Sequence, residues 1–155
     1  MSLDDNIRAL ARTPVLADIG RDALRLLAFS VEEIELRSGD LLFENGEEAD
    51  GAYCVIRGRI RLDSGKGEAK TVGRGALIGE LALIVETERP CEAVAIEDTK
   101  LLSIPRPVFR KVLEEFPAIA KQMRHRLSGK LRAEHAALER LQSQIDRLPG
   151  AKAEN

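Results

Sequence analysis

Apolar side chains recur at steps of three and four near the start of the chain. They run through residues 3–36, LDDNIRALARTPVLADIGRDALRLLAFSVEEIEL, with Pro14 and Gly20 as interruptions. Such spacing places apolar side chains on one face of a helix, and proline and glycine mark helix boundaries. The pattern therefore predicts two short helices before the main body of the fold.

From Glu33 onward the apolar runs become short, and glycines interrupt them. The stretch SGDLLFENGEEADGAYCVIRGRIRLDSGKGE carries glycines at its turns, and EAVAIED and KLLSIPR add two more runs further along. Short apolar runs with frequent glycine turns are typical of antiparallel β-structure. We expect an antiparallel sandwich or roll.

Helical spacing returns after the last predicted strand. RPVFRKVLEEF predicts a short helix, and Pro117 begins a long helix that extends to residue 148. Apolar residues form a seam along this helix at Leu127, Leu131, Leu138, Leu141, Ile145 and Leu148. Such a seam either packs against a second copy, giving a homodimer, or folds back on the β body. The predicted divisions are residues 1–116, the helix at 117–148 and a flexible tail at 149–155, with no helix-turn-helix domain expected.

Composition limits the class of protein. The chain has 155 residues, of which 44% are hydrophobic, and a formal net charge of −2, so it has room for one domain and no basic field for nucleic acid. No charged-then-apolar leader opens it, and Glu80 interrupts its longest apolar stretch. We therefore expect a cytoplasmic protein without a signal peptide or membrane span. Cys54 and Cys91 lie in apolar-rich strands, which favours reduced thiols, with a disulfide between them as the alternative.

One acid and one base stand at the two edges of an apolar stretch, IGELALIVETERPCEAVA, residues 78–95. Glu80 heads the apolar run, and Arg89 follows it, with Pro90 next in the chain. The pair has two interpretations. It is a structural ion pair at the edge of the core, or it binds a ligand that carries both a hydroxyl and an anion, because a carboxylate accepts from a hydroxyl and a guanidinium holds a phosphate.

The order of these features resembles the cyclic nucleotide-binding domains of catabolite activator proteins, cyclic-nucleotide-dependent kinase regulatory subunits and cyclic nucleotide-gated channels. The resemblance covers residues 7–116, and its most specific part is Gly79-Glu80-Leu81-Ala82-Leu83 followed by Arg89, nine residues after Glu80. It implies a mainly β fold, an antiparallel β-roll (jelly roll, double-stranded β-helix) with short N-terminal helices and a long C-terminal helix. It also implies a ligand-binding set: Gly79, Glu80, Leu81, Ala82, Arg89, Pro90 and Cys91.

The resemblance gives these residues roles toward a cyclic nucleotide. Glu80 accepts the ribose 2′-hydroxyl, Arg89 holds the cyclic phosphate, Gly79 lets backbone approach the sugar, and the Cys91 amide contacts the phosphate. A short helix beginning near Leu81 would add further amide groups facing the anion.

The family commonly places a small residue and then Thr or Ser two and three positions after the arginine, where this chain has Cys91 and Glu92. Because that hydroxyl helps to accept guanine, its replacement favours cyclic AMP as the ligand. Glu92 either contacts the base or faces solvent. The family also caps the base with a residue of the long helix, for which the candidates are Met123, Arg124 and Leu127, with a core position as the alternative for Met123.

Three other classes of function compete with a sensor. A metal-dependent enzyme needs several facing ligands, but His125 and His135, the only histidines, both fall on the long helix, so we expect no metal, no cofactor and no catalytic residue. That helix has no aromatic residue for stacking on bases, so direct nucleic-acid binding is not expected. The third is a nucleotide-free interaction or dimerisation module with a degenerate pocket. We expect a cyclic nucleotide sensor whose long helix moves on binding and acts on a twin subunit or an effector protein.

Overall fold

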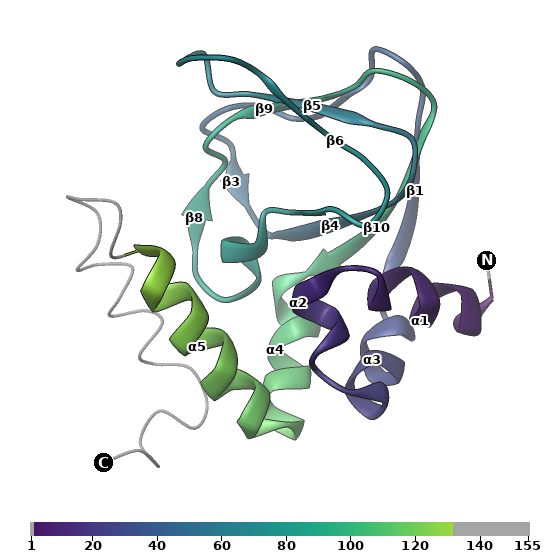
Figure 1. Ribbon diagram of the computed structural model, residues 1–155, viewed down its shortest axis with the longest axis vertical. Coiled ribbons are helices and arrows are strands. Elements are labelled where there is room, and N and C mark those ends of the chain that lie inside the picture. The colour runs from purple at the N-terminus through teal and green to yellow at the C-terminus, as the bar shows by residue number, and fades with distance from the viewer. Residues whose placement is uncertain (1, 132–155) are drawn as a thin grey trace.

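The computed structural model describes residues 2–131, with side chains as far as His125. Over this range the fold is mainly β with short helices (Figure 1). The helices are α1 (Leu3–Ala11), α2 (Pro14–Ala17), α3 (Arg21–Ala28), the 3-10 helix η1 (Glu80–Leu83), α4 (Arg106–Glu115) and α5 (Pro117–Leu131). The strands are β1 (Glu32–Leu36), β2 (Leu41–Phe43), β3 (Glu48–Ala49), β4 (Gly51–Arg57), β5 (Ile60–Asp63), β6 (Lys70–Val72), β7 (Leu77–Ile78), β8 (Thr87–Glu88), β9 (Glu92–Ala95) and β10 (Thr99–Pro105).

Three helices, rather than the predicted two, precede the first strand. α1 begins after Ser2, whose hydroxyl accepts from the Asp5 amide while the Asp5 carboxylate accepts from the Ser2 amide. Pro14 is the first residue of α2, a separate turn, because proline fits the first turn of a helix but cannot lie in its interior. The expectation of two helices was wrong because Pro14 begins a turn of its own.

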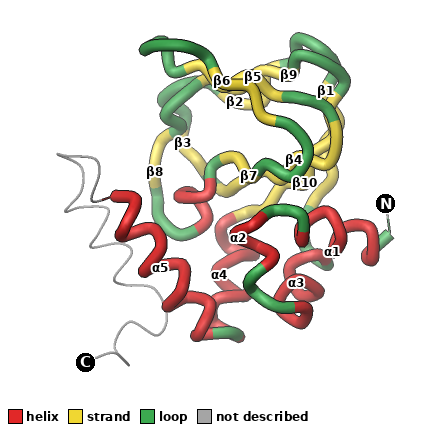
Figure 2. Tube along the Cα trace, in the orientation of Figure 1, coloured by secondary structure: helices red, strands yellow, loops and turns green. Residues whose placement is uncertain are grey.

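The described strands pair only in the antiparallel sense and form a roll. One sheet has the order β1-β10-β4-β7, a second has the order β2-β9-β5-β6, and β3 and β8 make a two-stranded ribbon. The two larger sheets form the lower and upper layers in Figure 1, and the helices gather beneath the lower layer (Figure 2). The predicted antiparallel roll is confirmed, and the runs EAVAIED and KLLSIPR contain β9 and β10.

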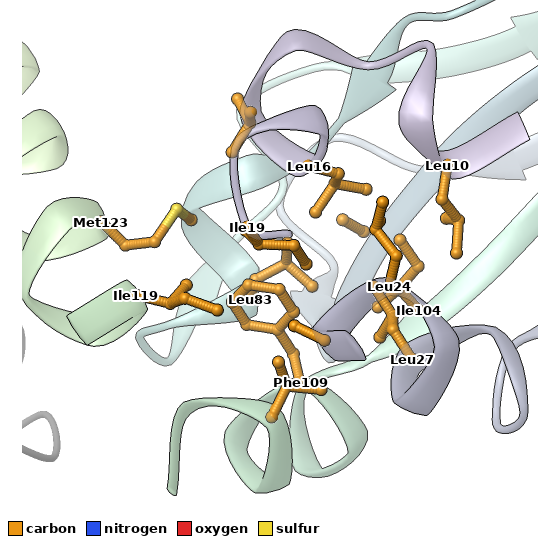
Figure 3. Close-up of a cluster of buried hydrophobic side chains, with 14 of the residues drawn as sticks. Leu10, Leu16, Ile19, Leu24, Leu27, Leu83, Ile104, Phe109, Ile119 and Met123 are labelled. Atoms are coloured by element: carbon orange, nitrogen blue, oxygen red, sulfur yellow. The ribbon is translucent and has the colours of Figure 1, made fainter. Parts of the chain in front are cut away.

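Two clusters of buried side chains stabilise this arrangement. The first joins the helices to the lower sheet and includes Leu10, Leu16, Leu27, Ile104 and Phe109 (Figure 3). The second fills the interior of the roll and includes Phe43, Val55, Ile60, Ala93 and Leu101. η1 contacts β4, β8 and α4, so it lies where the roll meets the helices.

The predicted long C-terminal helix is described only in α5, as far as Leu131. Its extension to residue 148, the seam positions from Leu138 onward and the tail at 149–155 lie outside the described residues, as do the side chains of Leu127 and Leu131. The homodimer seam therefore stays a prediction. None of the described helices has the length and apolar character needed to cross a membrane.

Candidate functional site

The candidate site begins where β7 ends. Gly79 follows β7 with a φ of 82°, a left-handed conformation that costs glycine little, and it turns the chain into η1. Backbone hydrogen bonds of 3.0 Å from Ala82 to Gly79 and 3.1 Å from Ile84 to Leu81 close the turn. Leu83 and Ile84 are buried in the first cluster and anchor the turn, and Ala82 is buried beside them in the chain. The predicted short helix is present, as a single 3-10 turn that begins at Glu80.

Arg89 follows β8, and its backbone is held from both sides. Its amide donates to the Glu47 carbonyl at 2.7 Å, and its carbonyl accepts from the Gly46 amide at 2.8 Å. These bonds extend the ribbon of β3 and β8. The side chain leaves this fixed backbone for the protein interior, where only 3% of the residue is exposed.

Two aromatic rings accommodate the buried guanidinium. The Arg89 Cζ atom lies 4.5 Å from the centre of the Phe43 ring and 5.4 Å from that of Tyr53, and the two rings stack at 6.2 Å. Phe43 pairs with Ala93 in the upper sheet, and Tyr53 pairs with Ile78 in the lower sheet, next to Gly79. The rings reach the guanidinium from opposite layers and stabilise its charge by cation–π interaction.

The guanidinium retains donors for a further partner. Its Nη2 atom forms an ion pair of 3.7 Å with Asp50 Oδ1, but the Asp50 side chain is 92% exposed. Among the residues that the structure describes, Arg89 Nε and Nη1 have no hydrogen-bond partner, although both atoms are buried. Buried polar groups are normally hydrogen-bonded, because removing a charge from water is costly. The arrangement therefore favours an anion with more than one oxygen at this position.

Gly79 and Arg89 meet in space although nine residues lie between them in the chain. A Cβ atom added to Gly79 would lie 2.5 Å from Arg89 Nη1 and 3.3 Å from the Gly51 carbonyl oxygen. The absence of a side chain at Gly79 thus leaves room for the guanidinium. Glu80, the next residue, is half-buried at the start of η1. The fold brings the predicted acid and base to the two ends of one short loop.

Two neutral groups adjoin the guanidinium. Burial raises the pKa of Tyr53 above its ordinary value, with the Arg89 charge acting in the opposite direction. Burial likewise raises the pKa of Cys91, which packs against the interior of the roll. Both groups are therefore uncharged near pH 7, and neither competes with an anion for Arg89. Cys54 and Cys91 are free thiols, so the disulfide alternative is not realised.

The other predicted ligand-binding residues lie along the same loop. Leu81 is half-buried against the first cluster, and Pro90 is exposed beside Arg89. Glu92 opens β9, where Ala93 and Ala95 are buried inside the roll. Because side chains alternate along a strand, Glu92 projects to the opposite face, which favours the solvent-facing alternative over a base contact.

The cap candidates lie on α5. Met123 is 3% exposed and belongs to the first cluster with Leu83 and Ile119, which Figure 3 shows on the same side of the core. This placement favours the core alternative for Met123. Arg124 is 6% exposed, and the side chain of Leu127 lies outside the description.

Three features of the site could not be found from the sequence: the pair Phe43 and Tyr53, the ion-pair partner Asp50, and Arg106, whose Nε donates to the Ala82 carbonyl of η1 at 3.1 Å. The chain has only four Phe and one Tyr, and this small number was the one feature of the sequence that could have drawn attention to Phe43 and Tyr53. In residues 2–131 no group of three or more His, Cys, Asp or Glu side chains is arranged to hold a metal ion.

Most of the chain is similar to known proteins. The family model described as "Cyclic nucleotide-binding domain" matches residues 33–116. A curated relative, lysophospholipase NTE1 of Chaetomium globosum, is 33% identical over 110 residues, which make up 68% of this chain but only 7% of that protein. The chain thus spans a small fraction of the length of such relatives.

Two solved structures are also similar to this chain. A cyclic nucleotide-binding-like protein from Brucella abortus is 41% identical, with a TM-score of 0.63 over 72% of this chain and 99% of that one. The N-terminal domain of a transcriptional regulator from Streptomyces coelicolor is 29% identical, with a TM-score of 0.68 over 81% of this chain and 91% of that one.

Proposed function

Because this chain belongs to the cyclic nucleotide-binding domain family, we propose that it is a cyclic AMP sensor without catalytic activity of its own. In this proposal the nucleotide binds between Glu80 and Arg89, and its binding changes the position of α5. The family itself identifies the chain as a cyclic nucleotide-binding domain of the regulatory kind.

The observation that carries the proposal is the buried Arg89 guanidinium with two donors left over. A cyclic phosphate has a single negative charge and two exocyclic oxygens. Nε and Nη1, which have no hydrogen-bond partner among the described residues, offer two N–H groups to such an anion. The ligand would thereby neutralise a charge that the fold has already removed from water.

Glu80 completes the recognition at the other end of the loop. A carboxylate at the start of η1 accepts a hydrogen bond from a ribose hydroxyl, while Gly79 lets the sugar approach the backbone. The choice of cyclic AMP over cyclic GMP rests on Glu92, which stands where the family commonly has a hydroxyl residue for guanine.

The proposed response of α5 depends on its packing against the site. Ile119, Ala120 and Met123 belong to the same buried cluster as Leu83 of η1. A displacement of η1 on binding would therefore change the surface on which α5 packs. This mechanism requires that the ligand bind the two positions of α5 with different affinity.

Thermal unfolding with cyclic AMP, cyclic GMP and acyclic AMP tests the proposed function. Ligand at a hundred times its dissociation constant should stabilise the protein by about 2.7 kcal/mol. At this chain length that gain corresponds to a rise in Tm of roughly 5–10 °C. Cyclic AMP should give the largest rise and acyclic AMP none. No shift with either cyclic nucleotide would favour a nucleotide-free interaction module instead.

Alkylation of Cys91 gives an independent measure of binding at the site. Cys91 lies two residues after Arg89 and is partly exposed, whereas Cys54 is fully buried and serves as an internal control. Bound cyclic AMP should slow the reaction of Cys91 without changing that of Cys54. An unchanged Cys91 rate in the presence of a thermal shift would place the ligand elsewhere.

Replacing Asp50 with asparagine is expected to tighten cyclic AMP binding by roughly 1.4- to fivefold, because an exposed ion pair contributes about 0.2–1 kcal/mol. The Asp50 carboxylate competes with the phosphate for the Arg89 guanidinium, 3.7 Å away. Isothermal titration at low ionic strength measures the effect, with Asp18→Asn, an exposed carboxylate after α2, as the matched control. Weaker binding by Asp50→Asn would mean that Asp50 orients Arg89 rather than competing for it.

A further inference from the structure

Arg106 joins three parts of the molecule through one residue. It is the first residue of α4 and is half-buried. Its Nε donates to the Ala82 carbonyl of η1 at 3.1 Å, and its Nη2 donates to the Ala49 carbonyl at the end of β3 at 2.5 Å. Its backbone amide donates to the Asp50 carbonyl at 2.8 Å.

The two segments that Arg106 holds are the two walls of the candidate site. Ala82 lies within η1, directly after Glu80 and Leu81. Ala49 precedes Asp50, the ion-pair partner of Arg89, and Gly51, whose carbonyl lies close to Gly79. Gly79, directly before η1, and Asp50, directly after β3, therefore both lie close to the Arg89 guanidinium.

The two hydrogen bonds of the Arg106 side chain can hold η1 and β3 at a fixed distance from each other. The carbonyls near the end of a short helix lack intrahelical partners and need other donors. The N–H groups of the Arg106 guanidinium lie in one rigid plane. A hydrogen bond to one carbonyl therefore fixes the direction in which the remaining N–H groups point toward the second carbonyl. Hydrogen bonds from a charged donor are also stronger than neutral ones. Arg106 thus holds η1 and the end of β3 at a set separation and links both to α4.

We propose that Arg106 is a positioning residue of the nucleotide site: its two side-chain bonds hold η1 against the end of β3 before any ligand arrives, and they connect both walls to α4. Arg106 does not contact the nucleotide in this proposal. The expected effect of Arg106 on ligand affinity rests on the proposed function. Its expected effect on the rigidity of η1 in the protein without ligand does not.

Hydrogen exchange on the protein without ligand tests the positioning directly. In Arg106→Gln the amides of Ala82, Ile84 and Val85 in and after η1 should exchange at least roughly tenfold faster, because two charge-assisted bonds are lost. Exchange in the central strands β4 and β10 should not change. Arg106→Lys, which reaches one carbonyl, should give an intermediate rate. Arg110→Gln, on the exposed side of α4, is the matched control and should match the native protein.

Titration with cyclic AMP tests the consequence for binding. The dissociation constant of Arg106→Gln should rise about tenfold at a temperature where the variant is fully folded, and that of Arg110→Gln should not change. Native exchange rates in η1 of Arg106→Gln would overturn the inference, and so would a uniform increase across all strands, which indicates general destabilisation. If the native protein binds no cyclic nucleotide, the proposed function fails, and the exchange rates of η1 still decide the role of Arg106.

Discussion

Replacing Arg89 with methionine is expected to abolish cyclic nucleotide binding while raising the melting temperature of the protein without ligand. Arg89 is 3% exposed, its ion-pair partner is almost fully solvated, and two of its donors have no hydrogen bond to any described residue. A buried charge with such incomplete partners is destabilising, and an apolar residue of similar length is often better tolerated. Methionine also packs well against aromatic rings such as Phe43.

The gain in stability from Arg89→Met should be about 1–2 kcal/mol, or roughly 2–8 °C in Tm. Loss of the charged fork should weaken cyclic AMP binding by roughly 30-fold or more, since removing a buried hydrogen-bonded charge costs about 2–5 kcal/mol. Thermal unfolding with and without cyclic AMP measures both quantities on the same samples.

Two further variants separate the causes. Arg89→Lys keeps the charge but loses the planar fork, so it should bind cyclic AMP weakly and gain no stability. Arg59→Met removes an exposed arginine that pairs with Glu97 on the surface, and it should leave ligand binding unchanged. Undiminished binding by Arg89→Met would remove Arg89 from the site, and a lower Tm would show that the rings and Asp50 already compensate its charge.

The loop from Gly79 to Arg89 could be predicted from the sequence because its geometry is mostly local. Gly79, Glu80 and the buried residues after them follow one another directly, and the glycine permits the left-handed turn that starts η1. The apolar run Ala82–Val85 then carries the chain through the core toward Arg89. A short stretch of sequence therefore contained both ends of the candidate site.

The surroundings of the guanidinium could not be predicted in the same way. Phe43 and Tyr53 belong to different sheets, and their rings meet only because of the registers of β2 with β9 and of β4 with β7. Arg106 reaches η1 from a helix that begins 24 residues after Ala82. Contacts of this kind depend on tertiary packing, on which the local pattern of apolar and polar residues carries no information.

The helical parts show a similar contrast. Spacing predicted the strands β9 and β10 and the helix α4, because each has a clear period and a proline or glycine near its ends. The sequence pattern predicts an interruption between helices at Pro14, whereas Pro14 is the first residue of the separate turn α2. A proline can end one helix or begin the next, and the local pattern does not distinguish the two. Met123 was a candidate to cap the base, with a core position as the alternative, and its side chain packs into the core beside Ile119.

Replacing Gly79 with alanine is expected to leave the protein folded but to remove most of its affinity for the ligand. The φ of 82° makes any L side chain strained, by about 1–2 kcal/mol. The new Cβ would lie 2.5 Å from Arg89 Nη1, the far end of a flexible side chain, so the guanidinium moves while the fold persists. Because that movement misplaces the phosphate donors, cyclic AMP binding measured by titration should weaken by roughly 10- to 100-fold.

Gly39→Ala provides the matched control, because it separates backbone strain from displacement of Arg89. Gly39 has a similar φ of 93°, but a Cβ added there would meet no atom within 4 Å. Both variants should lose stability in chemical denaturation because both force alanine into the left-handed region, and Gly79→Ala should lose somewhat more because its Cβ also meets Arg89 and the Gly51 carbonyl. Only Gly79→Ala should lose affinity. Equal affinity in the two variants would mean that the guanidinium can move without consequence, and that the contact between Gly79 and Arg89 does not shape the binding site.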